Sequence, residues 1–285
     1  MKVAKQIFIT ALEQQNQDNF TSTCRGYDLI IMVGILPSRD NEKLFQELQK
    51  SASHGTKLIY LFSMEDKALS PQTTFFSRYE VGSEEGVFAL LAKGLLDQET
   101  LPKKFQNYFN ELDEGYLSAE SNLGEEEIEE MALLYKESKN TLLVLGDDLV
   151  THPRAKHIAL LAGLIAHFGK AKIWVSNLEE VHISSDDISL PAEVEALKSF
   201  DGVVVYQCPI LIKEEEDLLI GSPQFQMAAK VQNGEKVSIS FAEQVHVRKF
   251  VVDSSLKGTI ALMPSVLNHN TSYRYHVAKI VKAEG

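Results

Sequence analysis

The feature that most constrains the fold of this chain is a pair of short apolar runs that each end at a glycine. Residues 27–33 read Tyr-Asp-Leu-Ile-Ile-Met-Val before Gly34, and residues 141–145 read Thr-Leu-Leu-Val-Leu before Gly146. A strand that does not alternate polar and apolar residues is typically buried on both faces, as in a parallel sheet. The two runs therefore predict inner strands of such a sheet.

Helical segments alternate with these runs and with further strand candidates. Residues 41–48 place Leu44, Phe45 and Leu48 on one helical face. Other helices are predicted over residues 83–95, 105–112, 128–135 and 155–168, and other strands over residues 57–62, 172–175 and 201–206. Strands that alternate with helices favour an α/β fold with a doubly wound, mostly parallel sheet.

The pattern changes after Cys208. Period-two alternation is found in residues 228–231 and 237–241, and Asn233-Gly234 between them is a strong hairpin signal. The alternation continues over residues 245–252, and another strand is predicted over residues 259–262. We therefore predict two domains, an α/β domain over residues 1–209 and a small mainly-β domain over residues 210–285.

The charge balance excludes one class of partner. The chain has 40 acidic and 28 basic residues, which gives a formal net charge of −12. Binding to nucleic acid normally requires a cluster of lysines and arginines, and the sequence has none. The dense charge runs, residues 125–130 and 214–217, are acidic. They indicate solvated surface, or alternatively a face that docks onto a basic partner.

Two cysteines, Cys24 and Cys208, limit the metal chemistry of the chain. A four-iron cluster needs four thiolate ligands, and a structural zinc ion needs a closely spaced Cys/His quartet. Both cysteines adjoin apolar strand candidates, where a free cysteine behaves as a small buried hydrophobe. The composition favours a cytoplasmic location, in which a disulfide between them is not expected.

No apolar run approaches the roughly 20 residues that span a bilayer. The N-terminal segment also lacks the apolar core and cleavage site of a secretory signal. We expect no direct membrane insertion. Met1 is compatible with a natural start and with the first residue of a fragment.

Two predicted strand ends are candidates for a ligand site, because open α/β sheets bind ligands at the carboxyl ends of their strands. The first offers Gly34, Pro37 and Ser38, and the second offers Gly146 and Asp147. Neither loop matches G-x-G-x-x-G, and neither has the lysine and hydroxyl of a P-loop. Tight strand-to-helix turns are therefore the favoured interpretation, and a residual pocket is the alternative.

Acidic and histidine residues follow the second strand end. Asp147 and Asp148 could be metal ligands, but a capping role for the next helix is favoured. His152 and His157 lack the intervening glutamate of a zinc protease, and they are interpreted as satisfied helix or surface residues. No G-x-S-x-G elbow is present. The sequence shows no catalytic constellation.

Several segments resemble molybdopterin oxidoreductases. The first of these units consists of an Asp, an apolar strand, Gly-x-x-Pro, a helix, and a Gly before a second strand. A later unit consists of a strand, a Gly and a helix. The closing segments resemble the end of the G subunit of bacterial NADH-quinone oxidoreductase (respiratory complex I). The segments concerned are residues 27–37, 55–60, 143–149, 152–155, 257–264 and 273–275.

The resemblance implies that this chain corresponds to the C-terminal part of that subunit. In the family, the iron–sulfur clusters are held by an N-terminal region that has no counterpart here, and the molybdopterin-like part of complex I carries no molybdenum cofactor. The resemblance thus implies no cofactor in this chain and a non-catalytic scaffold role. It also implies partners among the other subunits of the respiratory complex, and association with the inner membrane through them.

Two alternatives remain open. The first is a nucleotide- or molybdopterin-dinucleotide-binding module that uses the loops at Gly34 and Gly146. The second is an unrelated small-molecule enzyme of α/β architecture. In that enzyme His152 or His157 would meet Asp147 or Asp148 in a cleft.

Overall fold

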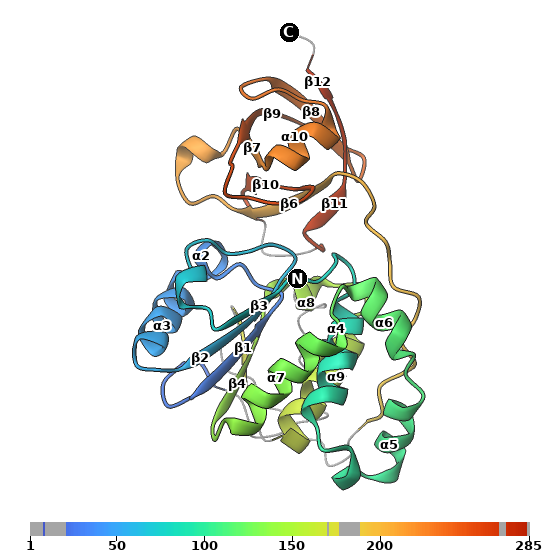
Figure 1. The fold of residues 1–285 in the computed structure, drawn as a ribbon. Coiled ribbons are helices and arrows are strands. Elements are labelled where there is room, and N and C mark those ends of the chain that lie inside the picture. The colour runs from blue at the N-terminus through green and yellow to red at the C-terminus, as the bar shows by residue number, and fades with distance from the viewer. Residues whose placement is uncertain (1–7, 9–20, 170, 177–188, 268–271, 284–285) are drawn as a thin grey trace. The chain divides into compact units, whose positions relative to one another are not determined.

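The structure is a computed structural model that describes residue 8 and residues 21–169, 171–176, 189–267 and 272–283 (Figure 1). The chain divides into two compact units, Met1–Lys198 and Ser199–Gly285. We call them unit 1 and unit 2, and each is described by itself. Among the described residues, no helix combines the length and the apolar character that a bilayer span requires.

Unit 1 is built on a five-stranded sheet in which every pair of neighbouring strands is parallel. The spatial order is β3-β2-β1-β4-β5, so the chain winds outward in both directions from the β1/β4 pair. All residues of β1 and β4 are buried. The strands are β1 (Leu29–Val33), β2 (Lys57–Leu61), β3 (Phe75–Ser77), β4 (Thr141–Leu145) and β5 (Lys172–Val175). The predicted doubly wound α/β fold is confirmed.

Helices cover both faces of this sheet, with α3 on one face and α4, α7 and α9 grouped on the other (Figure 1). The α3 helix begins where the side chain of Asn41 accepts a hydrogen bond from the amide of Leu44, and it buries Leu44 and Leu48. The helices are α2 (Pro37–Asp40), α3 (Glu42–Ser53), α4 (Glu84–Leu95), α5 (Lys103–Asn110), α6 (Glu114–Ser121), α7 (Glu125–Glu137), α8 (Asp147–Thr151) and α9 (Ala155–Gly169), with short 3-10 turns η1 (Ser70–Gln72) and η2 (Gln98–Thr100).

Unit 2 is a mixed seven-stranded sheet with one α-helix among its described residues. The spatial order is β11-β6-β10-β7-β9-β8-β12. Phe225 of the helix stacks on Phe250 of β9 at a ring distance of 5.8 Å, and both are fully buried in the core. The elements are β6 (Val204–Pro209), η3 (Lys213–Glu215), β7 (Leu218–Gly221), α10 (Pro223–Ala229), β8 (Lys236–Phe241), β9 (Gln244–Val252), β10 (Ile260–Ser265), β11 (Tyr275–Val277) and β12 (Lys279–Lys282).

The placement of residues 201–206 in the parallel sheet of the first domain was wrong. This segment forms β6, which pairs with β10 in parallel and with β11 antiparallel inside unit 2. An apolar strand that is buried on both faces has the same sequence pattern in either sheet. Its partner β10 lies 56 residues further along the chain, since Val204 pairs with Ile260.

The predicted hairpin at Asn233-Gly234 was also wrong. Residues 228–231 are not a strand, because α10 runs through Ala229 and ends at Lys230 in the left-handed conformation (φ 55°). The hairpin instead joins β8 to β9 through Ala242 (φ 46°) and Glu243 (φ 61°). Two successive positive φ angles give the type I′ geometry that matches the twist of paired strands, although neither residue is the glycine or asparagine that usually signals it.

Candidate functional site

The structure brings the two predicted loops together at the edge of the unit 1 sheet. Because β1 and β4 are parallel neighbours, Gly34 and Gly146 follow Val33 and Leu145, which are paired in register. The amide of Gly146 donates to the carbonyl of Val33 at 2.9 Å, and the amide of Asp148 donates to the carbonyl of Gly34 at 3.3 Å. This is the point where the strand order reverses, the usual ligand-binding position of a doubly wound sheet.

The two loops pack directly on each other at this position. A Cβ atom on Gly146 would lie 1.8 Å from the carbonyl oxygen of Gly34, so the two backbones are in direct contact. Gly34 adopts a left-handed conformation (φ 72°), and the side chain of Leu149 occupies the space where its Cβ would be, at 2.6 Å. The two glycines thus allow the loops to pack on each other, which is the tight-turn role.

Carboxylates of unit 1 accept hydrogen bonds from loop backbone amides, which are the donors that a bound phosphate would use. The amide of Leu36 donates to Asp40 at 2.8 Å, and that of Ser38 donates to Asp66 at 2.9 Å. Asp66 is only 2% exposed, and it also accepts the amide of Ala68 at 3.1 Å. Burial raises the pKa of Asp66, against the hydrogen bonds that lower it. Pro37 is buried and has no amide hydrogen to offer.

The remaining predicted residues near this edge are packed into the fold. Asp147 and Asp148 are buried in the first turn of α8, whose N-cap is Gly146, so they do not cap the helix as predicted. Carboxylates in the first turn still interact favourably with the helix dipole. Across the described parts of the chain, no group of three or more His, Cys, Asp or Glu residues could hold a metal ion.

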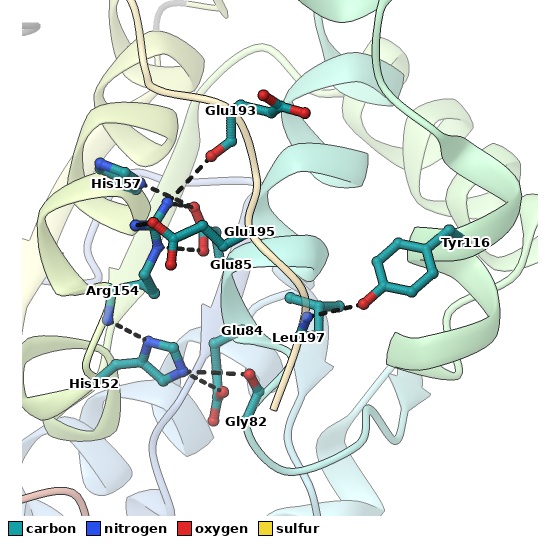
Figure 2. Close-up of polar contacts among 10 residues, drawn as sticks. All are labelled: Gly82, Glu84, Glu85, Tyr116, His152, Arg154, His157, Glu193, Glu195 and Leu197. Carbon is teal, nitrogen blue, oxygen red and sulfur yellow. Dashed lines mark hydrogen bonds and ion pairs between the residues drawn. The ribbon is translucent and has the colours of Figure 1, made fainter. Parts of the chain in front are cut away.

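A buried ionic cluster lies beside this edge, at the start of α4, and the sequence analysis did not identify it (Figure 2). Its centre is Glu85, which is 1% exposed. Arg154 donates two hydrogen bonds to this carboxylate, from Nε to Oε2 at 2.8 Å and from Nη2 to Oε1 at 3.0 Å. The Nδ1 atom of His157 lies 3.0 Å from Oε1 of the same carboxylate. The hydrogen bond with Glu85 is the main reason why the pKa of Arg154 is raised.

His152 belongs to the same cluster. Its Nδ1 accepts the amide of Arg154 at 3.0 Å, which places the ring proton on Nε2. Nε2 faces the fully buried carboxylate of Glu84 at 3.2 Å and the carbonyl of Gly82 at 3.4 Å. The structure therefore pairs His152 with Glu84 and His157 with Glu85.

The cluster fastens an extended segment, residues 189–198, to the helices. Arg154 also pairs with the carboxylate of Glu195 and donates to the carbonyl of Glu193 at 3.2 Å. Figure 2 shows the amide of Leu197 donating to the hydroxyl of Tyr116 in α6, at 2.9 Å. One arginine thus links α4, the start of α9 and this segment, and this geometry indicates a structural role.

The two cysteines are buried, and neither forms a disulfide in the structure. Burial, and then the nearby Glu47 carboxylate, raise the pKa of the Cys24 thiol to about 12. The carboxylate of Glu47 also accepts the amide of Cys24 at 2.8 Å. A thiol held in this protonated state is a poor nucleophile and a poor metal ligand.

Comparisons with known proteins add little to what the geometry shows about function. The chain matches no protein-family model and no curated protein sequence. Among solved structures it is similar to acetylene hydratase from Pelobacter acetylenicus, with 14% sequence identity and a TM-score of 0.49. That match covers 58% of this chain and 25% of the hydratase chain, so the chain spans about a quarter of its length. A likeness at this level says nothing about activity.

Proposed function

We propose that this chain is a non-catalytic scaffold region of an NADH-quinone oxidoreductase, equivalent to the C-terminal part of the G subunit. In this role it supports electron transfer from NADH to quinone in the assembled complex and binds no cofactor of its own. The observation that supports the proposal is the close packing of the two loops at the switch point, where Gly34, Gly146 and Leu149 contact one another. The sequence resemblance described above supplies the identity of the complex.

The polar groups of unit 1 support a structural role. The carboxylates of Asp40 and Asp66 accept loop amides, and that of Glu85 is held by a bidentate arginine. Such groups hold the packed elements in one arrangement. Rigidity matters for a scaffold because electron tunnelling depends steeply on the distance between cofactors. The iron–sulfur clusters would then be carried by a region N-terminal to the part represented here.

An acidic surface is available for a partner subunit. Glu125, Glu126, Glu129 and Glu130 lie on α7 with exposed side chains. A face of one charge sign steers association with a face of the opposite sign. We infer that a basic surface of another subunit docks there, and that the chain reaches the inner membrane only through such partners.

Co-migration tests the assignment to the complex. The protein is tagged at its own locus in the source cell, and detergent-solubilised membranes are separated on a native gel. The proposal predicts that the tag migrates with NADH dehydrogenase activity and with stoichiometric iron. Migration of the tagged protein alone, or in a complex without that activity, contradicts the assignment.

A ligand screen tests the absence of a nucleotide site independently of the complex. Thermal unfolding of the purified chain is followed with and without mono- and dinucleotides, including NADH and a guanine nucleotide. A ligand at 100 times its dissociation constant would add about 2.7 kcal/mol to the unfolding free energy. We expect no shift, because Leu149 and the loop contacts fill the position. A shift that Leu149→Ala enlarges would favour the nucleotide-binding alternative.

A further inference from the structure

The extended segment over residues 189–198, which we call the strap, buries one side chain in every three. Pro191 is buried and Val194 and Leu197 are half-buried, whereas the residues between these three are exposed. None of residues 189–198 belongs to a helix or a strand. A period of three residues in an extended segment is typical of a polyproline II helix, a conformation in which many peptide ligands are recognised.

The strap lies on a surface that α4, α6 and the start of α9 provide (Figure 2). Gly86 of α4 is buried and has no side chain, and a Cβ atom there would lie 2.9 Å from Cδ1 of Leu197 and 3.4 Å from Cδ2 of Leu117 in α6. The side chain of Leu197 therefore occupies the space over this glycine. We call Gly86, Tyr116, Leu117 and Arg154 the strap surface.

The polar part of the strap surface is held in place from within unit 1. The guanidinium of Arg154 donates to the buried carboxylate of Glu85 at 2.8 and 3.0 Å, so a residue outside the strap sets its orientation. Nη1 of Arg154 pairs with Glu195, and Nη2 donates to the carbonyl of Glu193 at 3.2 Å. An arginine fixed in this way is preorganised, which lowers the ordering cost of binding a peptide.

The strap itself contributes exposed partners to this contact. The side chain of Glu195 is 69% exposed, and an ion pair at such a position adds little to stability because water and salt screen it. Side chains of unit 1 hold the strap backbone, since the carbonyl of Glu193 accepts from Arg154 and the amide of Leu197 donates to the hydroxyl of Tyr116 at 2.9 Å. A segment held by such bonds opens at a lower free energy than the buried core.

We propose that the strap surface is a peptide-docking site, which unit 1 keeps occupied with its own strap, and that the strap leaves it while unit 1 stays folded. The peptide that fits is extended, has an apolar residue at every third position and carries carboxylates between them. A partner segment with this pattern would take the place of the strap. The inference goes beyond the scaffold role and does not rest on it, since the contacts lie inside unit 1.

Cleavage of the full chain by a glutamate-specific protease tests whether the strap opens. Leu197→Asp places a carboxylate over the space at Gly86, and Ala196→Asp is the matched control, because it adds the same charge at an exposed neighbour. Cleavage after Glu193 is measured by mass spectrometry, and each rate is divided by that of a free peptide of the same sequence. We expect Leu197→Asp to exceed the control by about 10-fold or more, since proteolysis follows the population of the open form. Equal rates would overturn the proposal.

The urea dependence of the same cleavage in the unaltered chain separates strap opening from unfolding of unit 1. Opening of the strap exposes little surface, so the normalised rate should be nearly constant below the unfolding transition, which the fluorescence of the buried Trp174 reports. A rate that rises as steeply with urea as the unfolded fraction would mean that the strap opens only when unit 1 unfolds. That result would also overturn the proposal.

A peptide supplied in trans tests the docking site itself. A fluorescent peptide of residues 189–198 is titrated into the Leu197→Asp chain and followed by anisotropy. We expect a dissociation constant below about 1 mM, and several-fold weaker binding to the unaltered chain, whose own strap competes at a high effective concentration. The same peptide carrying Leu197→Asp is the control and should not bind. Absence of binding to the Leu197→Asp chain, equal binding to both chains, or equal binding of both peptides would each contradict the docking site.

Discussion

Among the described residues, the two units bury charged side chains of opposite sign. In unit 1, the carboxylates of Asp66 and Glu85 are buried, and each accepts hydrogen bonds from its surroundings. In unit 2, the buried charged side chain among the described residues is Arg274, whose guanidinium lies 4.7 Å from the ring centre of Tyr206. The comparison teaches that unit 1 holds its buried charges by hydrogen bonds between its elements, while unit 2 holds its buried charge against an aromatic ring.

The largest expected effect is the protection of the two buried cysteines from thiol reagents. Cys24 reports on unit 1 and Cys208 on unit 2, in single-cysteine variants Cys208→Ser and Cys24→Ser. Labelling at pH 8 should be slower than in urea by about 10³-fold or more, because a buried thiol reacts only after the unit opens. We expect Cys208 to react faster than Cys24, since unit 2 is the smaller unit. Faster labelling of Cys24 would contradict this comparison.

The next effect concerns the ionic cluster of unit 1. Arg154→Met leaves the buried carboxylate of Glu85 without its main partner and should reduce the free energy of unfolding of unit 1 by about 3–5 kcal/mol. Trp174 is the one tryptophan of the chain and is buried in β5, so its fluorescence in urea measures this change. The control is Lys57→Met, which removes the exposed pair Lys57–Glu137 and should cost about 1 kcal/mol at most. Equal costs would mean that the cluster is not structural.

A third effect concerns the contact between the two loops. Gly146→Ala would place a methyl group against the carbonyl of Gly34 and should destabilise unit 1 by about 3 kcal/mol. Gly55→Ala is the control, because a Cβ atom at Gly55 would meet no neighbouring atom. Its left-handed backbone (φ 94°) should be the only source of strain, and we expect that substitution to cost about 1–2 kcal/mol of unfolding free energy. Both are measured by Trp174 fluorescence in urea. A Gly146→Ala cost at or below that of the control would show that the loops are not in close contact.

The smallest effect is a stabilisation of unit 2. Replacing Ala242 with Asn and Glu243 with Gly gives the β8–β9 hairpin residues that accept positive φ angles. We expect a gain of about 1 kcal/mol, observed as slower labelling of Cys208. Glu243→Gln keeps the strained backbone and should leave the rate unchanged. If the two variants label alike, the turn is not strained.

The inner strands of unit 1 were predictable from the sequence, whereas the pairing of β1 with β4, which brings Gly34 to Gly146, is known from the structure. Unalternating apolar runs such as residues 29–33 indicate a parallel sheet, and the ends of neighbouring parallel strands must lie side by side. The filling of that position by Leu149 was not predictable, because it depends on how one loop packs onto the other.

The ionic cluster of unit 1 and the inward face of β9 had weaker signals. Glu84 and Glu85 open a helix, where acidic residues are usually exposed, and Arg154 lies about 70 residues away in sequence. The apolar character of α4 on all sides was the one indication of burial. In β9, valines alternate with His246 and Arg248, and the alternation alone does not say which set faces inward.

Amide hydrogen exchange at Gly146 and Asp148 tests the central claim most directly, namely that unit 1 closes its own ligand position. If the loops are hydrogen bonded to each other, these amides should exchange only when unit 1 unfolds, at the same rate as the amide of Ile31 in β1. Exchange as fast as that of the exposed turn at Gly26 would contradict the claim and would mean that the switch point is open to a ligand.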